Sequence, residues 1–159
     1  MVDRKTPYTF ADEKTTLKDF IDYLRESVII KVQGLSDEDA RRELVPSGTS
    51  LMWLLKHLRD VETWWFQYLF LGLDVEFPDD DVKPDDTVEE AITTYREAIA
   101  HSNEIIAECE DLDIRAARAG RAPEPVTMRW LLVHMVEEIG RHAGHADILR
   151  EQIDGATGR

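Results

Sequence analysis

Apolar residues recur every three or four positions through four long stretches of the chain, which is the period of an amphipathic helix. The first stretch, residues 15–34, has Thr16 and Asp19 at the spacing of a capping box and closes at Gly34. Its apolar stripe consists of Leu17, Phe20, Leu24 and Val28. We therefore expect one helix over this stretch, including the short strand-like run SVII inside it.

The same pattern predicts three further long helices. The second runs over residues 50–72 and ends at Gly72. Thr87 opens the third helix, and Thr127 opens the last, which runs to Gly155. The third helix carries a seam in alternating steps of four and three, typical of bundles: Val88, Ile92, Tyr95, Ile99, Ser102, Ile106 and Cys109. A short helix capped by Ser36 is expected between the first two long ones.

The segments between these helices lack helical periodicity. Residues 73–86 and 111–126 contain prolines, with a run of acidic residues in the first and a glycine in the second, and they indicate loops. No convincing strand, internal repeat or low-complexity linker is present in the sequence. The sequence therefore predicts an all-α protein, a four-helix bundle with one extra short helix, in a single domain over residues 1–159.

Charge and cysteine content narrow the choice of partners. The net charge of −14 argues against nucleic acid and against an anionic membrane surface, because both favour a basic protein face. We expect no signal peptide and no membrane span, since the sequence lacks apolar stretches of the required kind. Cys109, the single cysteine, excludes an intramolecular disulfide and a cysteine-based zinc knuckle. A cytoplasmic protein with a buried Cys109 fits best.

Ionisable residues interrupt the apolar stripes of two helices. Glu138 and His142 lie at the centre of the last helix's stripe, and His57 lies on the apolar face of the second helix. Residues at positions i and i+4 have Cβ atoms about 5–6 Å apart, so one ion can bind both. A divalent metal would offset the cost of burying Glu138, and His57 would complete a His₂Glu set. Such a set leaves a fourth position for water or substrate.

Other roles are open for these residues. Taken alone, His57 is typical of a core histidine, and Glu138 with His142 is typical of a hydrogen-bonded helical pair. A di-iron bundle needs Glu-x-x-His motifs, and the spacing of Glu138 and His142 is one residue too long. His134 is a candidate for the core or for a position behind the metal ligands. Expected core residues are Trp53, Trp64, Trp65 and Trp130, whereas surface positions are expected for His101, Glu137 and Arg141.

Together, His57 and the string EIGRHAGH at residues 138–145 resemble the DinB-like superfamily. The closing string HADILREQIDG resembles an actinobacterial branch known as a domain of unknown function. The resemblance extends over nearly the whole chain and implies a DinB-like four-helix bundle. It also implies a divalent metal ion, zinc or nickel, held by His57, Glu138 and His142.

Glu138 stands where the commonest version of the superfamily has His, and in this it is similar to the mycothiol-dependent maleylpyruvate isomerases. The resemblance implies a thiol-dependent S-transferase or isomerase, in which the metal activates a low-molecular-weight thiol such as mycothiol toward a small electrophile. The alternatives are a metal-dependent hydrolase that uses bound water, and a metal-stabilised binding or stress-response module without turnover. Gly144 would allow close helix packing. His145, where Gln is common, is a second candidate for a position behind the ligands.

Large apolar side chains surround the second half of the helix predicted over residues 50–72. They are Trp53, Trp64, Trp65, Phe66, Tyr68, Leu69, Phe70 and Leu71. A helix that is apolar on all sides must be covered, either by the loop at 73–86 or by a second copy of the chain. We expect a homodimer, because two-fold dimers are the commonest soluble assemblies.

Overall fold

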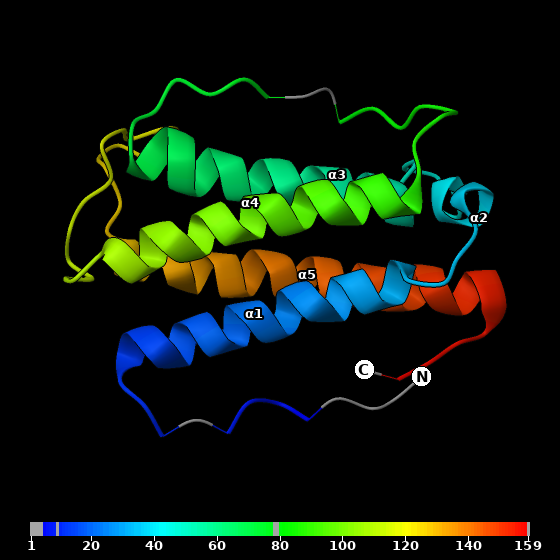
Figure 1. The fold of residues 1–159 in the computed structure, drawn as a ribbon, viewed down its shortest axis with the longest axis horizontal. Helices are drawn as coiled ribbons and strands as arrows, with labels where there is room; N and C mark the ends of the chain where they lie inside the picture. The colour runs from blue at the N-terminus through cyan, green and yellow to red at the C-terminus, as the bar shows by residue number, and fades with distance from the viewer. Residues whose placement is uncertain (1–4, 9, 78–79, 159) are drawn as a thin grey trace.

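A computed structural model describes residues 5–8, 10–77 and 80–158 of the chain. Its helices are α1 (Glu13–Val32), α2 (Asp37–Arg41), α3 (Leu51–Glu62), η1 (Thr63–Phe70), α4 (Val88–Glu108) and α5 (Met128–Asp154). Figure 1 shows the four long helices side by side, with the short α2 at one end of the bundle. The predicted all-α fold, a four-helix bundle with one extra short helix, is confirmed. None of the described helices has the length and apolarity needed to cross a membrane.

Most helix boundaries lie where the sequence predicts them. The hydroxyls of Ser36, Thr87 and Thr127 each accept a hydrogen bond from a backbone N–H in the first turn of α2, α4 and α5. Gly155 follows α5 with a φ of 73°, a left-handed conformation that glycine adopts without steric cost. These caps fix the ends of α5, the helix that carries two of the candidate metal ligands.

The start of α1 differs from the capping box predicted at Thr16. Asp12 is the cap, and its carboxylate accepts a hydrogen bond from the Thr15 N–H at 2.9 Å. The Thr16 hydroxyl donates instead to the Asp12 carbonyl within the first turn. The prediction was wrong because it overlooked an aspartate four residues earlier, and a carboxylate at this position also interacts well with the helix dipole.

The second long helix changes its winding halfway along. α3 passes into η1, a π-helix, after which the Leu71 N–H donates to the Phe66 carbonyl five residues earlier. A π turn holds more residues than an α turn, so the side chains that follow are rotated around the helix axis. Phe66, Leu69 and Phe70 are buried as a result. A stripe counted at the α-helical period alone does not predict this rotation.

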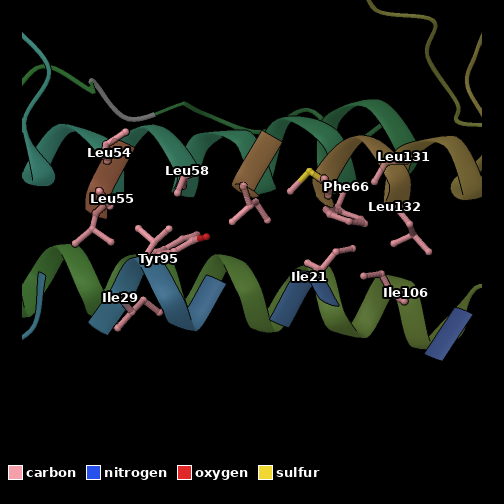
Figure 2. Close-up of a cluster of buried hydrophobic side chains, with 14 of the residues drawn as sticks. Ile21, Ile29, Leu54, Leu55, Leu58, Phe66, Tyr95, Ile106, Leu131 and Leu132 are labelled. Carbon is pink, nitrogen blue, oxygen red and sulfur yellow. The ribbon is translucent and has the colours of Figure 1, made fainter. Parts of the chain in front are cut away.

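The apolar core lies between two pairs of helices. α1 packs mainly against α5, and α3 packs mainly against α4. In Figure 2, side chains of α3, η1 and α5 face those of α1 and α4; the labelled ones are Leu54, Leu55, Leu58, Phe66, Leu131 and Leu132 opposite Ile21, Ile29, Tyr95 and Ile106. Burial of these side chains is the main favourable contribution to folding.

Two loops cover part of the apolar second half of the α3–η1 helix. Phe77 lies against Trp64 and Tyr68, with ring centroids 5.6 and 5.9 Å away. The Arg118 guanidinium lies over the Tyr68 ring, and the backbone N–H of Arg118 donates to the Leu69 carbonyl. The loop at 73–86 therefore gives some of the expected cover, and the loop at 111–126 gives more.

An ion cluster lies inside the core where α1, α3 and α4 meet. Arg25 donates to both carboxylate oxygens of the fully buried Glu62, at 2.7 and 2.6 Å. The remaining Arg25 nitrogen, Nη1, donates to Asp22 and Asn103 at 2.8 and 2.9 Å. Burial alone would lower the pKa of Arg25, but Glu62 and Asp22 outweigh burial and raise it. We call these four residues the Arg25 cluster.

Candidate metal centre

His57, Glu138 and His142, called the triad below, meet on the seam between α3 and α5. α5 supplies Glu138 and His142 one turn apart, and α3 supplies His57. Glu138 Oε1 lies 3.2 Å from His142 Nε2 and 3.5 Å from His57 Nε2. One ligand atom of each residue lies within 4.8 Å of the other two. The structure thus brings together all three residues that the sequence predicts as metal ligands.

Trp53 packs against both imidazoles of the triad. It lies one turn before His57 on α3 and stacks on that ring, with centroids 4.7 Å apart and an interplanar angle of 8°. The same indole meets the edge of the His142 ring at 6.5 Å. Trp53 was expected to be a core residue, and it does pack against the core, but it also packs directly on the triad. Its spacing of four residues from His57 is the signal that could have identified this role.

The electrostatics of the triad favour an ionised Glu138 beside a neutral His142. Burial alone would raise the pKa of Glu138, but His142, Arg141 and His57 outweigh it and bring the pKa below its ordinary value. Burial, followed by the nearby His57, lowers the pKa of His142, and Glu138 opposes this only in part. At neutral pH, Glu138 is therefore ionised and His142 is neutral, which are the protonation states that metal ligands require.

This donor set fits a divalent metal ion. Two imidazole nitrogens and one carboxylate converge on a single region, and they carry a net negative charge that a cation would offset. His142 is only 8% exposed, and its Nδ1 atom has no hydrogen-bond partner in the described part of the chain. The Nε2 atom is thus the ring nitrogen that faces Glu138. Two histidines with one glutamate are a known zinc set that keeps a position open.

The two histidines expected behind the ligands have different surroundings. His145 lies beside the triad, with its ring centroid 5.4 Å from that of His142. His134 lies one turn away from Glu138, between Trp130 and Trp65, at centroid distances of 5.0 and 4.6 Å. Its Nδ1 atom is 3.7 Å from Glu137. His145 is therefore a direct neighbour of the candidate ligand His142, and His134 belongs to an aromatic cluster.

Several other expectations are corrected or confirmed. Gly144 does not provide close helix packing, because a Cβ atom added there would meet nothing within 4 Å. Arg141 is exposed as expected, yet its Nη1 atom also reaches Glu138 at 3.5 Å, which the sequence analysis missed. His101 is exposed and Cys109 is buried, as predicted. Of the other tryptophans expected in the core, Trp65 is partly buried and packs against it, whereas Trp64 is partly buried outside it and Trp130 is 47% exposed.

Comparison with known proteins agrees with the fold and the sequence motifs. The structure resembles a DinB-like protein from Bacillus cereus ATCC 10987 with a TM-score of 0.64 and 20% identity, over 87% of this chain and 96% of that one. A conserved protein from Enterococcus faecalis matches with a TM-score of 0.61 and 18% identity, over 92% and 99% of the two chains. No curated protein matches this chain.

The fold is that of the DinB-like superfamily. Within it, the sequence model of the mycothiol S-transferase family matches residues 16–155, and the chain belongs to that family. The match includes all three residues of the triad and the whole of α3, η1, α4 and α5. At Glu138 the sequence resembles the mycothiol-dependent isomerases, whereas this family is named as an S-transferase.

Proposed function

We propose that the chain is a metal-dependent S-transferase that joins a low-molecular-weight thiol, mycothiol by the name of the family, to a small electrophile. The observation that carries this proposal is the triad, in which three ligand atoms converge while the His57 side chain stays 27% exposed to incoming molecules. The chain's own thiol is a poor nucleophile, because burial raises the pKa of Cys109. An external thiol therefore suits the site.

In this proposal the triad holds zinc or nickel, and Trp53 keeps the triad in place. A divalent ion bound there would lower the pKa of a coordinated thiol toward neutrality. Glu138 contributes the negative charge, and His57 and His142 contribute neutral nitrogen ligands. The stacked indole of Trp53 restricts rotation of the His57 ring and excludes water from that side of the ring.

The reaction is a nucleophilic displacement on carbon. The thiol gives its proton to a base in solution, and its sulfur forms a C–S bond with the electrophilic carbon. With an alkyl halide, the halide leaves with the electron pair of the broken carbon–halogen bond. His57 and His142 act as ligands in this scheme and accept no proton. We place the reaction in the cytoplasm, because that compartment keeps small thiols reduced.

The test combines metal content with thiol consumption. Protein loaded with zinc or nickel should convert mycothiol and an alkyl halide to the thioether, and His57→Ala and Glu138→Ala should lose both the metal and the activity. His101→Ala, at an exposed histidine of α4, is the matched control and should keep both. Metal-loaded wild-type protein that consumes none of the thiol would contradict the proposal, as would full activity in the metal-free His57→Ala variant.

We also propose that two copies of the chain associate through an aromatic surface that the loops leave open. Trp130 is 47% and Val133 53% exposed, and Trp65 lies 5.5 Å from Trp130 between ring centroids. Burying such side chains between two copies would be favourable. Sedimentation at micromolar concentration should give a dimer, and Trp130→Glu should convert it to the monomer. A wild-type mass of 18.3 kDa would contradict the dimer.

A further inference from the structure

A second recess lies beside the triad. The segment before α3 and the C-terminal half of α5 enclose a pocket of about 280 Å³, which is lined by Val45, Ser47, Thr49, His145, Ile148 and Leu149. We call it the Ile148 pocket. His145 lines this pocket, and its ring centroid lies 5.4 Å from that of His142. A molecule in this pocket would therefore lie one imidazole ring away from the candidate ligands.

The lining of the Ile148 pocket indicates the chemistry of its occupant. Three lining side chains are aliphatic, and none is an acid, a lysine or an arginine. The hydroxyls of Ser47 and Thr49 lie 2.9 Å apart and form a hydrogen bond with each other, so part of their polarity is already satisfied. An anionic occupant would give up its hydration without gaining a lysine or arginine partner in this lining. An uncharged, mainly apolar group fits better.

Exposure and volume support the same conclusion. Ile148 is 56% exposed, and a bound apolar group would remove part of this aliphatic surface from water. An apolar cavity of about 150 Å³ is enough to bind benzene in a protein. A pocket of about 280 Å³ therefore admits a single ring with a short reactive arm.

We infer that the Ile148 pocket binds the electrophile, and that the electrophile is a small, uncharged molecule with an aromatic or branched aliphatic group. Its reactive carbon extends past His145 toward the triad, and its apolar group lies against Ile148 and Leu149. This inference rests on the proposed S-transferase function, because that function calls for a second substrate beside the thiol. It adds the class of that substrate and the residues that select it.

The first experiment compares two electrophiles with the same reactive carbon. Benzyl bromide is neutral, and its para-carboxylate analogue differs by one negative charge. In both, sulfur displaces bromide and a C–S bond replaces the C–Br bond. The pocket predicts a KM for the carboxylate at least about tenfold above that for benzyl bromide, the factor that corresponds to 1.4 kcal/mol. Ile148→Asp should raise the KM for benzyl bromide by a similar factor, with metal content and the KM for the thiol unchanged.

Ile114→Asp is the matched control, because Ile114 is also a largely exposed isoleucine, at 47%, but lies in the loop at 111–126. It should leave the KM for benzyl bromide at the wild-type value. A second measurement needs no turnover: benzyl alcohol, which is neutral and unreactive, is titrated into protein with labelled isoleucine methyl groups. The Ile148 methyl resonance should shift with saturation, and the Ile114 resonance should not.

The outcomes separate the pocket from the proposed function. If no thiol reacts with any halide but benzyl alcohol still shifts Ile148, the S-transferase proposal fails and the apolar pocket stands. If turnover occurs while Ile148→Asp behaves like Ile114→Asp and the Ile148 resonance does not move, the pocket inference is overturned and the S-transferase proposal stands. Equal KM values for the two bromides would also overturn the selection of uncharged substrates.

Discussion

The Arg25 cluster and the triad are two polar groups at helix interfaces, and they differ in how far each satisfies its own charges. Arg25 meets Glu62 through two hydrogen bonds of 2.7 and 2.6 Å, and Asp22 and Asn103 accept from its remaining nitrogen. In the triad, the corresponding contacts are 3.2 and 3.5 Å, and two nitrogens face one carboxylate oxygen. The first cluster contains its own cation, whereas the second contains converging groups that could hold one.

This difference distinguishes a polar cluster that aligns helices from one suited to bind a ligand. A closed cluster with matched donors and acceptors fixes how helices align, and a further ligand would have to break existing bonds. An open cluster with converging acceptors gains from a cation that enters from outside. In this bundle α3 contributes to both clusters, with Glu62 directed toward α1 and His57 directed toward α5.

The largest predicted effect comes from breaking the Arg25 cluster. Arg25→Met leaves the Glu62 carboxylate buried without its partner, and we expect the free energy of unfolding in urea to fall by about 3–5 kcal/mol. The double variant Arg25→Met with Glu62→Leu removes both charges and should recover most of this loss. A loss below about 1 kcal/mol in the single variant would show that water reaches Glu62 and that the cluster is not closed.

The next effect concerns the triad and depends on metal. Zinc at about one hundred times its dissociation constant should raise the free energy of unfolding by about 2.7 kcal/mol, because the ion binds the folded state. His57→Ala should show no such increase, and Arg25→Met should keep it. After chelation the wild-type protein should still give the circular dichroism of a helical bundle, since the apolar core does not involve the triad. Complete unfolding on chelation would mean that the ion is required for the fold.

The triad could be predicted from sequence because its residues break a simple pattern. Glu138 and His142 lie at the centre of an apolar stripe at helical spacing, and His57 does the same on the facing helix. Burying an ionisable group is unfavourable unless it has a partner, so the pattern itself indicates a binding site. The four long helices were predictable because their apolar stripes are long and the caps at Thr87, Thr127 and Gly155 are typical.

The Arg25 cluster and η1 could not be predicted in this way. Arg25 and Glu62 are two of many charged residues on their helices, and only the ion pair that they form between α1 and α3 distinguishes them. The π winding of η1 is accompanied by contacts with a loop, such as the hydrogen bond from the Arg118 backbone N–H to the Leu69 carbonyl. These contacts join residues distant in sequence, and a periodic pattern within one helix does not contain them.

A smaller effect is expected from Trp53, which stacks on His57 of the triad. Trp53→Leu removes the ring that stacks on His57, and we expect the affinity for zinc to fall by about tenfold, as for other residues that support metal ligands. Trp64→Leu is the matched control, because Trp64 lies on the same helix but contacts Phe77. Competition with a chromophoric chelator measures both affinities. Equal loss in the two variants would assign the effect to general packing.

When no metal is present, acid should destabilise the protein through two residues of the triad, His142 and Glu138. The pKa of His142 is lowered from 6.5, so protonating it in the folded state is unfavourable, and stability is lost as the pH falls below 6.5 toward the folded value. The pKa of Glu138 is lowered from 4.5, so its contribution is present above 4.5 and is lost as the pH falls further. In urea titrations of the metal-free protein, His142→Gln should flatten the first decline. His101→Gln should leave it unchanged.

The smallest predicted effect comes from Arg141, the exposed cation beside Glu138. Arg141 lies 3.5 Å from Glu138, is exposed, and contributes to the lowered pKa of that carboxylate. Because its charge also repels a cation, Arg141→Gln should tighten zinc binding by a factor of about two to five at low salt. The gain should shrink as the salt concentration rises, since exposed charges are screened. Weaker binding in this variant would show instead that Arg141 holds Glu138 in position, which would make it a supporting residue of the triad like Trp53.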